Sequence, residues 1–145
     1  MEVEPSKCSF MIFTRKKIPN LPSLTIDSQR IKIVTRHKYL GMTLDAPFLS
    51  WTPHISNLIL NCHSRLNVMK ALSGTSWGCS RRLLNQFYMA YIRSSLDYGA
   101  FLYSSASATQ LKKISTIQSA AARIISGAWR STPIISLNTE LGLLP

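Results

Sequence analysis

The sequence is poor in acidic residues. Its 145 residues include 6 aspartates and glutamates against 17 lysines and arginines, which gives a formal net charge of +11. The six acids are Glu2, Glu4, Asp27, Asp45, Asp97 and Glu140. Apart from Glu2 and Glu4, at an end that we expect to be frayed, no two are spaced as a pair. Because two-metal phosphoryl transfer and acid–base catalysis need converging carboxylates, we expect neither a metal site nor catalytic residues.

Long apolar runs and cysteine pairs are also lacking. No run approaches the roughly 18 apolar residues that a membrane span needs, and the acidic N-terminus lacks the apolar core of a signal peptide. Cys8, Cys62 and Cys79 form an odd set without a Cys-x-x-Cys pair, which indicates a reducing compartment and no disulfide framework. The sequence also has no glycine-rich phosphate loop, nucleophile elbow or zinc motif.

The histidines do not combine into a metal site. His54 and His63 lie about 180° apart around a predicted helix, so they cannot bind one metal. Cys62 falls in the apolar stripe of the same helix, which favours a core position over a ligand. A catalytic Cys–His pair stays open as an alternative, although no neighbouring group is placed to activate the thiol.

The sequence does have a large excess of positive charge, together with enough apolar residues to form a packed core. Hydrophobic residues make up 46% of the chain, which is ordinary for a folded protein. The surplus favours a polyanionic partner, nucleic acid first and an anionic membrane surface second, and we expect nucleic acid and no membrane. The alternative is a fragment whose acidic half lies elsewhere in a longer chain.

The first third of the chain alternates as strands do. Ser9–Phe13 predicts a short buried strand, and Leu24–Ile26 with Ile31–Ile33 predicts a hairpin around a polar turn. The stretch His37–Asp45 adds a further strand. Gly41, inside it, marks a bulge or a close backbone approach, and a packing glycine at a sheet edge is the alternative.

The remainder repeats as helices do. Thr52-Pro53 is a start signal of N-cap and first-turn proline, and Thr132-Pro133 repeats it. Apolar periodicity predicts helices at about residues 52–74, 80–98, 109–127 and 132–141, with a break near Gly99. The predicted fold is therefore α+β, with a small antiparallel sheet in residues 1–50 followed by a bundle of three to four helices in residues 51–145.

Polar and basic side chains line one face of the third predicted helix. Lys112, Thr116, Ser119 and Arg123 fall within roughly 60° of one another, and Arg130 follows nearby. Such a row can track a phosphate backbone. For any single residue, a solvated surface charge is the alternative.

Three stretches occur in the order found in reverse transcriptases of non-LTR, jockey-type retrotransposons. They are Pro5–Lys16, Lys38–Asp45 and Tyr98-Gly99. Shorter pieces, such as Gly127-Ala128 with Arg130, extend the resemblance over nearly the whole chain.

The resemblance implies roles for both parts of the chain. Lys7 is similar to the lysine of motif D, which borders the nucleotide site, although Cys8 stands where the family has threonine or a similar residue. Lys38–Gly41 resembles motif E, the primer grip, in which a tight strand turn approaches the primer's 3′ end. Residues 1–50 would then be the palm edge, and residues 51–145 the thumb and linker, which hold a template–primer duplex through its backbone.

The family's catalytic Asp-Asp box lies upstream of motif D, and no Asp-Asp occurs in this sequence. The resemblance therefore implies a truncated fragment of an RNA-directed DNA polymerase that is inactive by itself. Magnesium is expected only in a full-length polymerase, so no cofactor is expected here. The family also implies an intracellular location, in cytoplasm and nucleus.

We expect an RNA–DNA or DNA duplex as the partner, together with the missing polymerase regions. The candidate contacts are Lys7, Arg15, Lys16, Lys17, Lys38, Tyr39, Gly41, Lys112, Arg123 and Arg130. The alternative is a non-catalytic interaction module. In that case the broad apolar face of the second predicted helix drives self-association or binds a protein partner.

Overall fold

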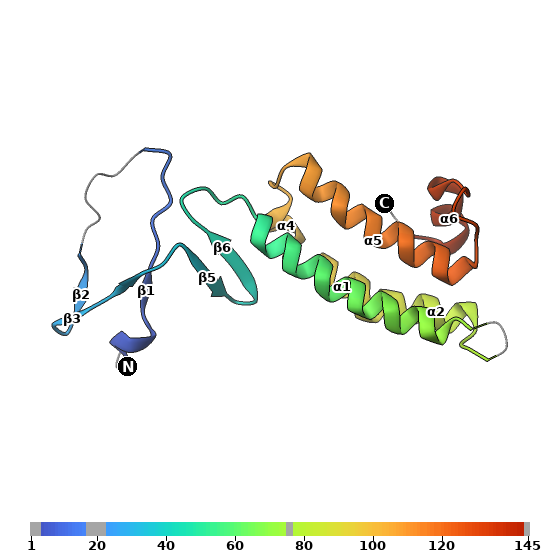
Figure 1. Ribbon diagram of the computed structural model, residues 1–145, viewed down its shortest axis with the longest axis horizontal. Helices are drawn as coiled ribbons and strands as arrows, with labels where there is room; N and C mark the ends of the chain where they lie inside the picture. The colour runs from blue at the N-terminus through green and yellow to red at the C-terminus, as the bar shows by residue number, and fades with distance from the viewer. Residues whose placement is uncertain (1–3, 17–22, 75–76, 144–145) are drawn as a thin grey trace. The chain divides into compact units, whose positions relative to one another are not determined.

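A computed structural model of the chain describes residues 4–16, 23–74 and 77–143. The chain divides into two compact units, Met1–His54 and Ile55–Pro145. Short strands occupy the first unit and helices the second (Figure 1). The predicted α+β class is confirmed.

Among its described residues, the N-terminal unit holds three separate two-stranded ladders rather than one antiparallel sheet. They pair β1 (Ser9–Phe10) with β4 (Lys32–Ile33), β2 (Thr25–Ile26) with β3 (Gln29–Arg30), and β5 (Arg36–Tyr39) with β6 (Met42–Asp45). The β1–β4 ladder is parallel and the other two are antiparallel. A long connection separates β1 from β4, which is what parallel pairing requires. A 3₁₀ turn at Pro5–Lys7 precedes β1.

The stretch His37–Asp45 forms most of a hairpin, not the single strand that its alternation predicted. Leu40 and Gly41 connect β5 to β6 with φ of 45° and 81°. A two-residue loop with both central residues at positive φ matches the right-handed twist of the flanking strands. Gly41 is exposed, so it serves a tight turn and not the packing of a sheet edge.

The second unit consists of helices whose positions follow the predicted ones closely. They are α1 (Thr52–Leu72), α2 (Arg81–Phe87), a π-helical segment (Tyr88–Arg93), α3 (Ser94–Asp97), α4 (Ala100–Tyr103), α5 (Ala108–Ser126) and α6 (Ile134–Leu141). The segments from Arg81 to Asp97 are continuous and form the second predicted helix. Its break near Gly99 is confirmed, because Tyr98 is extended and Gly99 has a φ of 70°.

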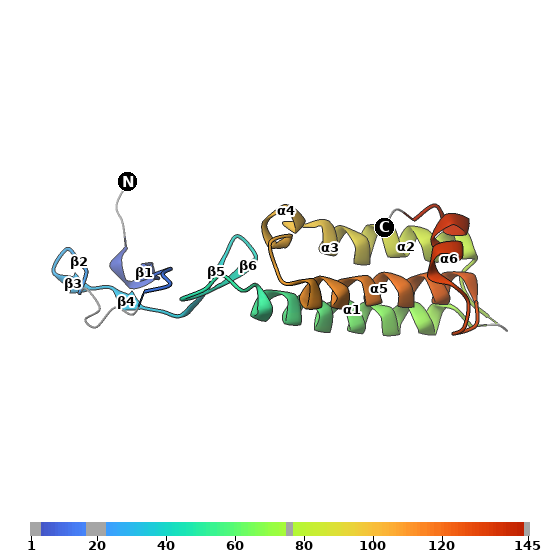
Figure 2. The same cartoon turned by 90° about the horizontal axis from the view of Figure 1, so that it is seen from above.

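The core of the helical unit draws on each of its long helices. α5 runs alongside α1 in both views (Figure 1 and Figure 2). The fully buried side chains include Cys62 and Met69 of α1, Tyr88 and Ile92 of the π-helical segment, Ile117 of α5 and Leu137 of α6. Cys62 is therefore the core residue that its place in the apolar stripe predicted.

Replacing Ile117 by alanine should destabilise the helical unit strongly. Ile117 is 0% exposed and Ile135, on α6, is 81% exposed. Loss of the buried side chain leaves a cavity and should lower the free energy of unfolding by roughly 2–5 kcal/mol, whereas Ile135→Ala should change it by less than about 0.5 kcal/mol. Urea unfolding followed by circular dichroism measures both. Equal unfolding midpoints for the two variants would contradict this packing.

Candidate nucleic-acid interface

A basic groove lies between α1 and α5 in the helical unit. This cavity of about 590 Å³ is lined by Lys70, Thr116, Ser119, Ala120, Arg123, Ile124 and Arg130. Three cationic side chains from three places in the chain meet there. Thr116, Ser119 and Arg123 belong to the row predicted from the third helix, and Arg130 was predicted to lie near it. Lys112, at the start of that row, is exposed but does not line the groove.

Lys70 is the groove residue that sequence reasoning missed. It belongs to the last turn of α1, far along the chain from α5. No local pattern connects the two positions, because only the packing of α1 against α5 brings them together. A search for basic residues near the ends of neighbouring predicted helices would have added Lys70 to the candidate contacts.

Arg123 is held in place by its own helix. Its Nη1 donates a hydrogen bond to the carbonyl oxygen of Ser119, at 3.3 Å. Its Nε is buried and has no hydrogen-bond partner within the described part of the chain. Because a guanidinium carries five N–H donors in a rigid fork, Arg123 is oriented and keeps donors for a ligand.

No carboxylate among the described residues lines the groove, so none of them cancels its positive charge. Residues 55–145 contain the basic residues Arg65, Lys70, Arg81, Arg82, Arg93, Lys112, Lys113, Arg123 and Arg130, against Asp97 and Glu140 alone. Asp97 pairs with Arg93 at 3.2 Å, and Glu140 pairs with Arg81 at 2.6 Å. Both acids of this unit are thus engaged by arginines outside the groove.

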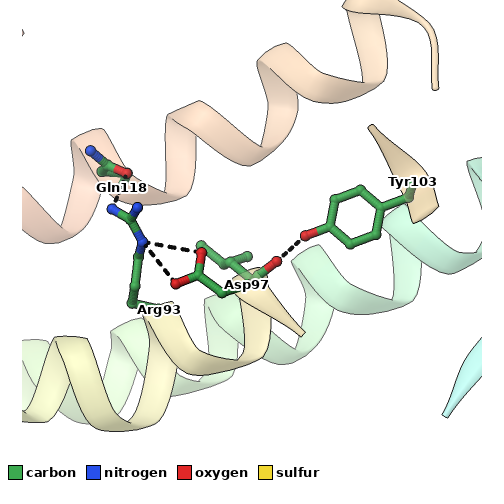
Figure 3. A network of polar contacts seen from close by, with 5 residues as sticks. Arg93, Asp97, Tyr103 and Gln118 are labelled. Atoms are coloured by element: carbon green, nitrogen blue, oxygen red, sulfur yellow. Dashed lines mark hydrogen bonds and ion pairs between the residues drawn. The ribbon is translucent and has the colours of Figure 1, made fainter. Parts of the chain in front are cut away.

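A second cavity, of about 290 Å³, is built around the Arg93–Asp97 pair. Arg93 Nε donates to both carboxylate oxygens of Asp97 at 3.2 Å, and its Nη1 donates to Oε1 of Gln118 at 3.3 Å (Figure 3). The Tyr103 hydroxyl donates to the carbonyl oxygen of Leu96. Burial raises the pKa of the Tyr103 phenol, and the nearby Asp97 charge adds to that effect. The network ties α3, α4 and α5 together, and its arginine is neutralised.

The predicted contacts of the N-terminal unit are exposed. Lys38 and Tyr39 lie in β5, where Tyr39 is 61% exposed, and Gly41 follows in the hairpin turn. Arg15 and Lys16 are exposed after β1. The structure therefore leaves these positions accessible, and their binding role stays a prediction. Lys17 lies outside the described residues.

Lys7 is paired with an acid. Its Nζ lies 2.6 Å from a carboxylate oxygen of Glu4, and both side chains are mostly exposed. The Lys7 ammonium, followed by the Ser6 hydroxyl, lowers the pKa of the Glu4 carboxyl. Exposed ion pairs of this kind are weak, so the pair does not decide whether Lys7 acts as the motif-D-like lysine.

Side-chain hydrogen bonds join the hairpin to residues 50–54, all within the first unit. The Thr43 backbone N–H donates to Nδ1 of His54 at 3.3 Å. Asp45 accepts from the backbone N–H groups of Ser50 and Trp51, at 3.3 and 3.1 Å. Trp51 is 2% exposed and meets the His54 ring edge-on, with the ring centroids 6.1 Å apart. Asp45 and His54 thus have structural roles here.

Acid should weaken this attachment. Burial lowers the pKa of His54 below its ordinary 6.5, so the folded unit holds the neutral ring while the unfolded chain takes up a proton. Stability is therefore complete above about pH 6.5 and falls as the pH drops toward the lowered pKa of the folded state. NMR titration should give His54 a pKa below 6.5. When the pH falls from 7.5 to 5.5, the free energy of unfolding measured with urea should decrease less in the His54→Gln variant than in the unaltered chain. Equal pH dependence in both proteins would exclude His54 as the cause.

No group of three or more histidine, cysteine, aspartate or glutamate side chains able to hold a metal occurs among residues 4–16, 23–74 and 77–143. The helices of that same part of the chain include none with the length and apolar character of a membrane span. The cysteines Cys8, Cys62 and Cys79 are free.

The chain is similar in sequence to RNA-directed DNA polymerases. It is 29% identical over 128 residues to the "RNA-directed DNA polymerase from mobile element jockey" of Drosophila funebris. It is 27% identical over 132 residues to the polymerase of the same name from Drosophila melanogaster. Each match covers 88% of this chain, and the chain spans about 14% of the length of each relative. No family model matches the chain, and no solved structure matches it.

These similarities confirm the resemblance to jockey-type, non-LTR retrotransposon reverse transcriptases that the ordered motifs indicated. Each similarity extends over 88% of the chain.

Proposed function

We propose that this chain is the part of a reverse transcriptase that holds a template–primer duplex by its backbone, through the basic groove of the helical unit. The observation that carries the proposal is the convergence of Lys70, Arg123 and Arg130 on one concavity, which no carboxylate of the described residues lines. The similarity to jockey polymerases supports nucleic acid as the polyanion.

Charge supplies the contacts in this proposal. Guanidinium groups bind phosphate through two parallel N–H···O bonds, and an ammonium binds it as a point charge. The Thr116 and Ser119 hydroxyls already donate to carbonyl oxygens of their own helix, at 2.6 and 3.0 Å. They therefore add polar acceptors to the wall, while the cations take the phosphates.

The predicted row on α5 matches the length of a short strand segment. Lys112 and Arg123 are separated by about 16 Å along the helix at 1.5 Å per residue. At a rise of about 3.4 Å per nucleotide in one strand, this distance corresponds to about five nucleotides. Lys112 would extend the groove contacts toward the N-terminal end of α5.

The N-terminal unit contributes a primer grip in the same proposal. The exposed turn at Gly41, with Lys38 and Tyr39 beside it, would approach the primer's 3′ end, and Lys7 would border the nucleotide site. Arg15, Lys16 and Lys17 would add phosphate contacts. The 145 residues contain no adjacent aspartates. We therefore propose that the catalytic carboxylates and magnesium belong to other regions of a full-length polymerase, and that this chain alone does not polymerise.

Removing a groove cation should make duplex binding weaker and less salt-dependent. Each phosphate contact contributes about 0.9 to the slope of log affinity against log salt for B-DNA, because binding releases counterions. Lys70→Gln and Arg130→Gln should each reduce the slope by about that amount, for DNA and RNA–DNA duplexes alike. Fluorescence anisotropy across a salt series measures it.

The matched control is Arg82→Gln, which removes the same charge from an exposed position on α2 outside the groove. It should leave the slope within error of the unaltered chain. Equal slopes for all four proteins would mean that the groove does not hold the duplex, and absence of binding at about 50 mM salt would remove the function itself.

The alternative proposal is self-association through the second predicted helix, which spans residues 81–97. Leu84, Tyr88 and Ile92 are buried, but Leu83 is 53% and Tyr91 is 49% exposed on the other side of the predicted apolar face. Such a patch is covered when a partner packs on it. Size-exclusion chromatography over a concentration series tests this alternative: Leu83→Ser should abolish a salt-insensitive dimer, whereas a monomer at every concentration would rule it out.

A further inference from the structure

Trp129 is the most exposed large hydrophobic residue in the described part of the chain. Its exposed fraction is 85%. It lies in the turn between α5 and α6, and Arg130, which lines the basic groove, follows it directly. An indole left in water at the edge of a cationic concavity has an unused apolar face beside charges suited to phosphate.

Hydrogen bonds donated by backbone N–H groups order the turn that carries Trp129. Gly127 ends α5 with a φ of 67°. The Ala128 N–H donates to Oγ of Ser126 at 3.2 Å, and the Thr132 N–H donates to the Trp129 carbonyl oxygen at 3.0 Å. These bonds hold the backbone on both sides of the tryptophan, so little further backbone entropy needs to be lost when its ring binds a ligand.

We infer that Trp129 is a stacking platform for an unpaired nucleobase, next to the phosphates held by the basic groove. The inference rests on the proposed function and names its ligand more closely: a duplex with a single-stranded extension. Inside a duplex both faces of each base are covered by neighbouring base pairs. An unpaired base, by contrast, offers a face to an aromatic side chain, and every base has such a face.

Charge and aromatic surface act on different parts of one strand in this arrangement. Arg130 and Arg123 would bind phosphates, while the adjacent indole would take the base. Proteins that bind single strands without sequence preference combine these two elements, and loss of one stacking residue typically weakens binding by roughly 5- to 150-fold.

The test compares two ligands that carry the same phosphates. One is a duplex with a five-nucleotide thymidine overhang, and the other has the same overhang made of abasic nucleotides. The full 145-residue chain should bind the base-bearing ligand roughly 5- to 150-fold more tightly. Trp129→Ala should remove this preference without weakening binding to the abasic ligand, and Trp129→Phe should retain most of it.

Phe101→Ala is the matched control. Phe101 is 80% exposed, and it lies on α4, at the opposite end of the helical unit from the α5–α6 turn (Figure 1). This variant should keep the full preference. Circular dichroism should give unchanged melting for both alanine variants, because neither side chain is part of the core.

Three results would overturn the stacking role: equal affinity of the unaltered chain for both ligands, equal weakening of both by Trp129→Ala, or the same loss of preference in Phe101→Ala. The groove variants separate this failure from that of the proposed function. If Lys70→Gln and Arg130→Gln still lower the salt slope, the groove binds phosphate and only the stacking site is wrong. If the chain binds neither ligand, both inferences fall.

Discussion

The helical unit depends on α5 having two faces of opposite character. Ile117, Ala121 and Ile125 are buried against the other helices, which sets the rotation of α5 about its own axis. The same rotation places Arg123 in the groove, because a helix turns by a fixed 100° per residue. Lys70 of α1 lines the same concavity. The rotation of α5 that buries its apolar face therefore also fixes the position of Arg123.

The two cavities of this unit contain arginines in different surroundings, one beside a carboxylate and one beside a backbone carbonyl. Arg93 meets Asp97 and Gln118, and its guanidinium is used to join helices (Figure 3). Arg123 donates to a backbone carbonyl, and within the described part of the chain no carboxylate lines its groove. The two acids among residues 55–145 pair with Arg93 and Arg81, and no carboxylate of the described residues lines the groove.

The parts predicted from the sequence are those governed by local physics. Apolar periodicity and the glycines at positions 99 and 127 located the helices and their ends. The antiparallel reversal after Ile26 was predicted, although β2 pairs with Gln29–Arg30 and not with Ile31–Ile33. The parallel β1–β4 pair was beyond reach, because ladders of two residues carry little periodicity. Lys70 required the tertiary packing of α1 on α5. Trp129 was passed over because a single aromatic residue in a turn has no pattern, and its meaning comes from its exposure beside Arg130.

A polymerase must hold whatever sequence it copies, and this requirement limits the chemistry of its grip. Base-edge hydrogen bonds would favour some sequences, whereas phosphates and base faces are common to all nucleotides. In the arrangement proposed above, the cations that line the groove would take phosphates, and the exposed indole in the turn after α5 would take a base face. The two elements respond differently to conditions: the charge contacts weaken steeply with salt, while stacking does not release counterions. A strand end held by both would therefore stay in place at salt concentrations that loosen a plain duplex.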